Sequence, residues 1–183
     1  MRIIGGTAKG HAIKAPKGLD TRPTLDRVRE SVFNVLANRG IFGSDILDIF
    51  SGTGAVAIEA LSRGTAHAVA VDFKTGKLIL ENAKHCHVDD RLEIIPRKLS
   101  QLKNYIVGRQ FDYIFSDPPY ENEFIQDTID LVVNYALLKP EGVLLLEHHK
   151  DEVFTLPESW ECIKEQKFGY TVVSYFVKTA ERS

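Results

Sequence analysis

Short apolar runs alternate with amphipathic segments along the chain from about residue 45 onward. The apolar runs have the length of buried strands, and the segments between them repeat apolar positions with the spacing of a helix. We therefore predict strands at 45–50, 66–71, 92–95, 111–116 and 143–147. The predicted helices lie at 55–63, 75–87, 99–107 and 123–137, with a turn at 139–142.

Two further strands are predicted at 160–167 and 170–178, joined at Gly169 as a terminal hairpin. Strand–helix alternation favours a mostly parallel sheet covered on both faces. The predicted fold class is therefore α/β, with a seven-stranded, Rossmann-like sheet that ends in an antiparallel hairpin.

The first 23 residues show a different pattern, in which apolar and basic residues alternate loosely around glycines. Ile3-Ile4 and Ala12-Ile13 can pair as a small hairpin, followed by a loop at 18–23. Thr24 is the expected N-cap of a helix whose apolar face carries Leu25, Val28, Val32, Val35 and Leu36. We expect residues 1–23 to form a basic arm and residues 24–183 to form one domain.

Composition narrows the class of protein. The 183 residues are 44% hydrophobic and 26% charged, as in a soluble globular domain. No apolar run reaches the roughly 18 residues of a membrane span, and no secretory signal is evident. With only Cys86 and Cys162 and no disulfide-like spacing, the chain is expected in the cytoplasm, without a membrane partner.

The net charge of −2 is unevenly distributed. Residues 1–30 hold seven Lys or Arg against three acidic residues, a balance of +4, which leaves −6 for the remainder. Such an arm suggests an anionic partner, with nucleic acid as the first candidate, although the charge taken alone slightly favours a solvated surface. The candidate RNA contacts are Lys9, Arg22, Thr24, Arg27 and Arg29.

A glycine turn follows the first strand of the predicted sheet. Gly52 and Gly54 permit a sharp turn, and the helix after them directs free N–H groups toward a ligand. Gly52, Gly54 and Ala57 also match the dinucleotide-binding pattern, in which an acidic residue follows the glycines after about 20 residues, as Asp72 does here. Asp48 beside this turn suits a ligand with an ammonium and a sulfonium better than one with a pyrophosphate.

The fourth strand leads into Asp117-Pro118-Pro119-Tyr120. The prolines restrict their own backbone and that of the residue before each of them, so the segment is a stiff platform. A carboxylate and a backbone carbonyl held together accept two hydrogen bonds from an exocyclic amine, and an aromatic ring stacks on a base. This platform, the glycine turn and Asp72 all lie at the carboxyl edge of the sheet, where ligands bind in such folds.

No metal site is predicted. His85 and His87 are two residues apart on a helix and point in different directions, and His148-His149 has no further ligand cluster beside it.

These motifs together resemble a known family. The residues from Asp48 to Gly54, the acidic Asp72 and the Asp117–Tyr120 platform are similar to those of S-adenosylmethionine-dependent amino-methyltransferases of nucleic-acid bases. The N-terminal part resembles the bacterial 16S ribosomal-RNA guanine-N2 methyltransferase family. The segments that carry this likeness are Arg2–Gly6, Arg22-Pro23-Thr24, Asp26–Glu30 with Phe33-Asn34, and Ile58–Gly64.

The resemblance implies a class I methyltransferase fold and methylation of one guanine in an assembled or partly assembled small subunit, by a protein expected to be a monomer. It implies S-adenosylmethionine as cofactor, bound by Asp48, Ser51, Gly52, Gly54, Asp72 and Phe73. It implies that Asp117, Pro118, Pro119 and Tyr120 hold the flipped guanine. Pro96-Arg97-Lys98-Leu99 departs from the family, which places an acidic residue there for the adenine amine; backbone groups or Ser100 are the expected substitutes.

Three alternatives stay open. Another amino-methyltransferase, acting on DNA adenine or a protein glutamine, shares the motifs. A nicotinamide dehydrogenase explains the glycine pattern but gives the Asp117–Tyr120 platform no role. A non-catalytic RNA-binding assembly factor would keep the fold alone.

Overall fold

The strands form one sheet in a computed structural model, which describes residues 1–16, 23–120 and 123–180. Within these residues the strand order is β3-β2-β1-β4-β5-β7-β6. Strands β1 to β5 run parallel, β7 runs antiparallel to β5, and β6 runs antiparallel to β7. The strands are β1 (Asp45–Ile49), β2 (His67–Val71), β3 (Leu92–Ile95), β4 (Phe111–Ser116), β5 (Leu138–His149), β6 (Trp160–Phe168) and β7 (Thr171–Lys178). The predicted fold class is confirmed.

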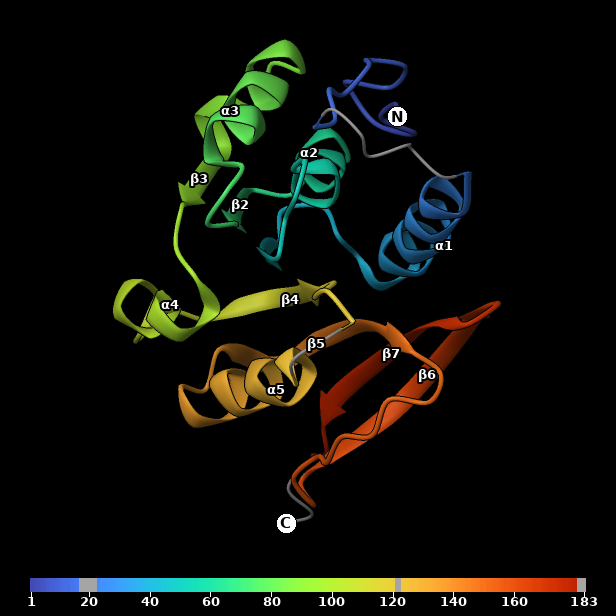
Figure 1. The fold of residues 1–183 in the computed structure, drawn as a ribbon, viewed down its shortest axis with the longest axis vertical. Coiled ribbons are helices and arrows are strands. Elements are labelled where there is room, and N and C mark those ends of the chain that lie inside the picture. Colours follow the sequence, from blue (N-terminus) through green and yellow to red (C-terminus); the bar gives the residue numbers. More distant parts are fainter. Residues whose placement is uncertain (17–22, 121–122, 181–183) are drawn as a thin grey trace.

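Helices cover both faces of the sheet (Figure 1). Three pack on one face, namely α1 (Pro23–Arg39), α2 (Ala55–Ser62) and α3 (Gly76–His85). Two pack on the other, namely α4 (Leu99–Ile106) and α5 (Phe124–Asn134), and a short 3-10 helix spans Asp89–Arg91. Successive residues of a strand point to opposite faces, so Leu145 joins the first core while Leu144 and Leu146 join the second. Burial on both faces explains why the central strands read as continuous apolar runs.

Two element boundaries differ from prediction by three residues or more. Strand β5 begins at Leu138, so residues 139–142 belong to the strand rather than to a turn. Helix α5 ends at Asn134, because Ala136 has a positive φ of 49° and the buried Leu137 and Leu138 draw the chain into the sheet.

The start of α1 also differs. The helix begins at Pro23, so Thr24 lies inside it and is not its N-cap. Proline suits the first helical position, where its missing N–H would have no helical partner.

The N-terminal arm contains the predicted hairpin in reduced form. Arg2 and Ala12 form an antiparallel bridge, and the Ile3 N–H donates to the His11 carbonyl at 3.0 Å. Ile3, Ala8 and Ile13 are buried and belong to the same core as α1 and α2. The arm is therefore packed onto the body of the protein through its apolar residues.

A buried carboxylate on α2 fastens this arm. Glu59 is fully buried and accepts hydrogen bonds from the Ile4 N–H at 2.9 Å and the Gly5 N–H at 2.8 Å. Its oxygens also lie 2.8 Å from Arg63 Nε and 3.5 Å from Arg29 Nε. One side chain thus joins the arm, α1 and α2.

Candidate functional site

The glycine turn between β1 and α2 encloses the carboxyl group of Asp48. Asp48 is buried, and its Oδ2 accepts hydrogen bonds from Ser51 Oγ at 2.6 Å and from the Ala57 N–H at 3.2 Å. Gly52 and Gly54 have φ values of 59° and 81°, which explains why the turn requires glycine. Asp48 uses one N–H from the first turn of α2 and sets a carboxyl group beside the turn, which disfavours a dinucleotide pyrophosphate there.

Asp72 follows β2 and supports the same turn. Its Oδ2 accepts from the Gly52 N–H at 3.1 Å, and its Oδ1 accepts from the N–H groups of Lys74 and Thr75 at 2.9 and 3.2 Å. A carboxylate offers about four acceptor sites, so Oδ2 keeps capacity for a ligand hydroxyl. Phe73 beside it is half exposed, and the ammonium groups of Lys74 and Lys98 lie 5.1 and 5.5 Å from its ring centroid.

The Asp117–Tyr120 platform extends from the end of β4. Asp117 is partly buried, Pro118 is buried and Pro119 is exposed. Tyr120 turns toward the terminal hairpin, where its hydroxyl lies 3.0 Å from Thr171 Oγ1 and its ring meets His149 edge to face. The structure therefore places Tyr120 at the rim, 56% exposed and outside the lining of the cavities described below.

Glu147 on β5 is a site residue that sequence reasoning missed. The register pairs Ser116 with Leu146, so the next residues of the two strands, Asp117 and Glu147, lie side by side. Asp48 pairs with Phe115, two residues before Asp117, so all three carboxyl groups face the same side of the sheet. An acidic residue directly after an apolar run, as at Asp48 and Asp72, was the available signal.

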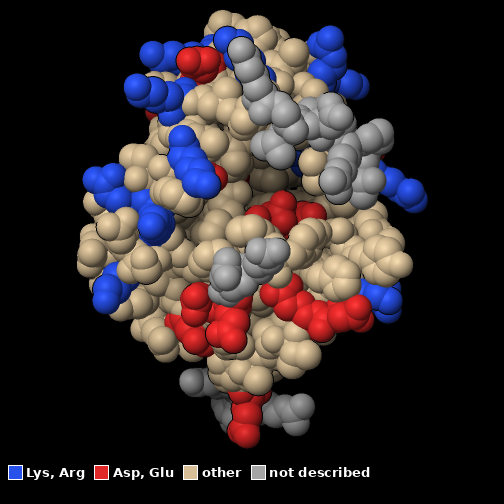
Figure 2. All heavy atoms as spheres, in the orientation of Figure 1, with Lys and Arg blue, Asp and Glu red and all other residues tan. Residues whose placement is uncertain are grey.

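Two cavities of about 280 Å³ each meet at Asp117 and Phe50. The Asp48 cavity lies between α1 and the sheet edge and is lined by residues that include Met1, Leu25, Val28, Asp48, Gly52 and Glu147. The Asp72 cavity is lined by residues that include Ile49, Asp72, Phe73, Lys98, Leu99 and Pro119. Figure 2 shows acidic side chains in a hollow near the middle of this face, with Lys and Arg side chains gathered above and beside it.

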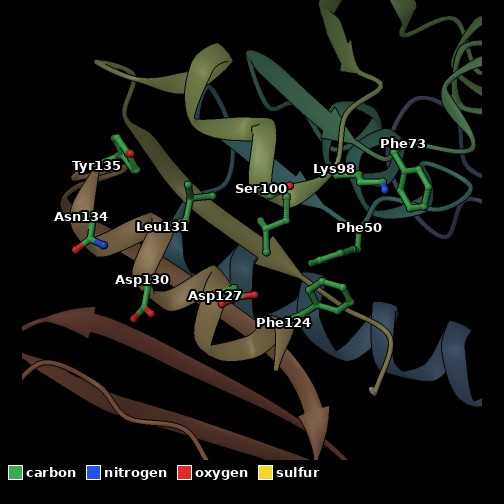
Figure 3. Close-up of a pocket in the computed structure, with 11 residues that line it drawn as sticks. Phe50, Phe73, Lys98, Ser100, Phe124, Asp127, Asp130, Leu131, Asn134 and Tyr135 are labelled. Carbon is green, nitrogen blue, oxygen red and sulfur yellow. The ribbon is translucent and has the colours of Figure 1, made fainter. Parts of the chain in front are cut away.

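A larger cavity of about 540 Å³ lies between α4 and α5 and shares Phe50, Phe73, Lys98, Leu99 and Phe124 with the Asp72 cavity. Figure 3 shows Phe50 and Phe124 next to each other, and their ring centroids are 5.3 Å apart. Ser100 projects into this cavity from α4. Arg97 stands near the position where the family places an acidic residue. Its Nε donates to the Tyr105 hydroxyl at 2.7 Å, and as a donor it cannot accept a hydrogen bond from an adenine amine.

The carboxyl groups of Asp48 and Glu147 are each buried and repelled by Asp117. Burial raises the pKa of Asp48 to about 7, against the hydrogen bonds from Ser51 and Ala57 and with help from Asp117 and Asp72. Burial raises the pKa of Asp117 to about 7. Burial and then the charge of Asp117 raise the pKa of Glu147 to about 8. Such a site favours ligands that bring positive charge or N–H donors.

The residues predicted to contact RNA are spread over different environments. Lys9 and Arg27 are exposed. Arg29, expected on a solvated face, is buried and donates to the Arg2 carbonyl and, at 3.2 Å, to Asp26. Arg22 and the side chain of Thr24 lie outside the described part of the chain.

The described residues contain neither a metal-binding cluster nor a membrane-spanning helix. No group of three His, Cys, Asp or Glu side chains there has an arrangement that could hold a metal ion. No helix within 1–16, 23–120 and 123–180 is both long enough and apolar enough to cross a bilayer.

Comparison with known proteins adds independent information. A family model described as "Conserved hypothetical protein 95" matches residues 1–177. The chain is 33% identical to "Putative rRNA methyltransferase YlbH" of Bacillus subtilis, over 97% of this chain and 99% of the relative. It is 32% identical to "Ribosomal RNA small subunit methyltransferase D" of Haemophilus influenzae, over 96% of this chain and 91% of the relative.

Solved structures agree with these relatives. A structure described as "Putative methyltransferase yhhF" from Escherichia coli is 30% identical and superposes with a TM-score of 0.86, covering 99% of both chains. The match extends from the N-terminal arm to the terminal hairpin. The chain therefore belongs to the "Conserved hypothetical protein 95" family, together with small-subunit ribosomal RNA methyltransferase D.

Proposed function

We propose that the protein transfers a methyl group from S-adenosylmethionine to the exocyclic N2 amine of a guanine in 16S ribosomal RNA. The observation that carries the proposal is the meeting of two cavities at Asp117, one lined by Asp48 and the other by Asp72. A cofactor and a base bound in adjoining cavities bring their reacting atoms together, which is the main requirement of a direct transfer. The names of the relatives support ribosomal RNA of the small subunit as the substrate.

The residues around the glycine turn fit the cofactor. S-adenosylmethionine supplies a methyl group activated by a positive sulfur. The negative charge of Asp48, held by Ser51, complements a cationic ligand, and Gly52 leaves open space where any other residue would place a Cβ. Position 54 also requires glycine, because a Cβ there would lie only 3.0 Å from the Ile79 side chain. Asp72 binds the ribose, and Phe73 covers the adenine from the side that faces solvent.

The adenine amine needs an acceptor other than an acidic residue. Ser100, or the backbone at the start of α4, takes this role in our proposal, because α4 borders the cavity that holds Phe73 and Lys98. This contact would be weaker than one to a carboxylate.

The Asp117–Tyr120 platform orients the base. The exocyclic amine of guanine is a weak nucleophile because its lone pair is delocalised into the ring. Asp117 and the Pro118 carbonyl accept its two N–H groups and stabilise the positive charge that develops on nitrogen. The new C–N bond forms as the C–S bond breaks, sulfur becomes a neutral thioether, and the amine gives one proton to Asp117 or to water.

Other residues of the platform support the flipped base. Pro119 keeps the segment rigid, and Tyr120 turns from the rim to stack on the base, which offsets part of the cost of base extrusion.

Lys9, Arg27, Arg22 and Thr24 contact the RNA backbone in this proposal, whereas the burial of Arg29 gives it a structural role. The substrate in this proposal is an assembled or partly assembled small subunit, because a basic arm this small provides only weak binding to naked RNA. The protein acts as a monomer in the cytoplasm.

A methyl-transfer assay tests the proposal. Labelled S-adenosylmethionine is offered with small subunits, naked 16S ribosomal RNA, duplex DNA and a glutamine-containing protein extract, and the products are hydrolysed. N2-methylguanosine from the subunits supports the proposal, while label only in DNA or protein contradicts it. Asp117→Ala should abolish transfer and leave cofactor affinity within a few-fold; full activity of this variant would refute the role of Asp117.

A further inference from the structure

Glu147 is a buried carboxyl group for which the proposed reaction, as described so far, gives no role. It is 5% exposed and ends the apolar part of β5. Among the described residues, none donates a hydrogen bond to its side chain and none forms an ion pair with it. In the described ranges, the fully enclosed polar side-chain atoms without a hydrogen-bond partner are Arg29 Nε, Thr65 Oγ1 and Thr75 Oγ1, so the oxygens of Glu147 instead open onto the Asp48 cavity, where a ligand can donate to them.

The position of Glu147 indicates what that ligand presents. Glu147 lines the Asp48 cavity beside Asp117, its neighbour in the sheet register. Arg29 lines the same cavity, but its guanidinium is occupied by Asp26, Glu59 and the Arg2 carbonyl. Two adjacent carboxyl groups therefore face the space next to the methyl-acceptor position, and within the described part of the chain neither of them forms an ion pair.

Two adjacent acceptors match the Watson–Crick edge of guanine. Guanine offers two neighbouring donors there, the N1–H and the N2 amine. Adenine offers one donor, its N6 amine, beside a bare N1 that is itself an acceptor. A carboxylate opposite N1 thus bonds guanine and repels adenine.

We propose that Glu147 is a specificity-determining residue that accepts the N1–H of the target guanine, while Asp117 and the Pro118 carbonyl accept its N2 amine. The inference rests on the proposed function and names the group that selects the base. Before binding, burial and the nearby Asp117 keep a proton on Glu147, since its pKa is raised to about 8. Guanine donors stabilise the ionised form, so that proton leaves when the base enters.

The test uses 2-aminopurine in place of the mapped target guanine, introduced by ligation into otherwise identical ribosomal RNA that is then reconstituted into small subunits. This base keeps the exocyclic N2 amine but lacks both the N1–H and the O6 carbonyl, so the comparison of Glu147→Gln with wild type is needed to separate the contact assigned to Glu147 from any contact to O6. At about pH 9, where Glu147 with its pKa of about 8 is mostly ionised and cannot donate to a bare N1, wild-type protein should prefer guanine over 2-aminopurine by at least about 100-fold in kcat/KM, because a site built for a donor rejects an analogue that lacks it.

The informative variant is Glu147→Gln, which preserves shape and can either accept from an N1–H or donate to a bare N1. It should reduce the guanine preference to below about 10-fold while cofactor affinity and Tm stay near wild type. The matched control is Glu141→Gln, an exposed position on the same strand, which should retain the wild-type preference. A purely structural role for Glu147 would change stability without changing this ratio.

Each outcome is decisive. Collapse of the preference in Glu147→Gln alone supports the inference. Equal use of the two bases by wild type, or an unchanged preference in Glu147→Gln, overturns the inference and leaves guanine methylation standing. If wild type methylates guanine in no ribosomal acceptor, the proposed function fails and the inference fails with it.

Discussion

The buried carboxylate of Glu59 allows a quantitative test of how the N-terminal arm is held. In the wild-type protein both carboxylate oxygens of Glu59 face donor groups. In Glu59→Gln, one of these oxygens is replaced by an NH₂ group. Oε1 faces the Gly5 N–H and Arg63, and Oε2 faces the Ile4 N–H and Arg29. Either orientation of the glutamine therefore sets a donor against two other donors.

The expected loss follows from this geometry. Glu59 is fully buried and the Arg29 side chain is only 4% exposed, so the guanidinium loses a counter-charge that water cannot replace. Burial lowers the pKa of Arg29 and the charge of Glu59 opposes this effect, so the guanidinium charge depends on its partner. Removing one partner of a buried pair costs about 3–5 kcal/mol. For a chain of this size that is a Tm decrease of about 6–20 °C.

Urea unfolding and thermal melts of the cofactor-free protein measure this loss. The matched control is Glu81→Gln, which removes an ion pair of 3.5 Å between the arm residue Lys14 and α3. Both of these side chains are more than 60% exposed, so the control should lose at most about 1 kcal/mol. Faster tryptic cleavage after Lys9 and Lys14 in Glu59→Gln would place the damage in the arm. A loss below about 1 kcal/mol, equal to that of the control, would refute the reasoning.

Three further predictions concern the site. Asp48 has a folded pKa of about 7, above its unfolded value, so it destabilises the free protein increasingly as pH rises from about 4 to about 7. Urea unfolding should therefore show Asp48→Asn gaining about 2–3 kcal/mol relative to wild type between pH 5 and pH 8; a constant difference would contradict the pKa assignment. Asp72→Ala should weaken S-adenosylmethionine binding more than about 10-fold by calorimetry, because it removes both a ribose ligand and the acceptor of the Gly52 N–H; unchanged affinity would exclude Asp72 from the site. Arg27→Ala should weaken subunit binding at low salt and reduce the slope of log affinity against log salt by about 1, whereas Arg109→Ala, on the distant α4–β4 connection, should not.

Part of the candidate site could be predicted from local sequence patterns. Asp48, Asp72 and Asp117 could be placed at one edge because each follows a buried strand, and parallel strands end at the same edge of a sheet. The glycine turn was predictable for the same reason, since Gly52 and Gly54 adopt positive φ values that other residues rarely adopt.

Tertiary structure alone decided the environment of the charged residues. Arg29 and Arg27 look equivalent in the sequence, yet Arg29 is buried between α1, α2 and the arm because Glu59, thirty residues later, provides its counter-charge. Likewise, the pairing of β4 with β5 sets Glu147 beside Asp117 although thirty residues separate them. The sequence determined the elements and the edge at which they meet, because strand and turn signals are local. Only the fold decided which carboxyl groups share a cavity, because that depends on strand order and on the helix packed above them.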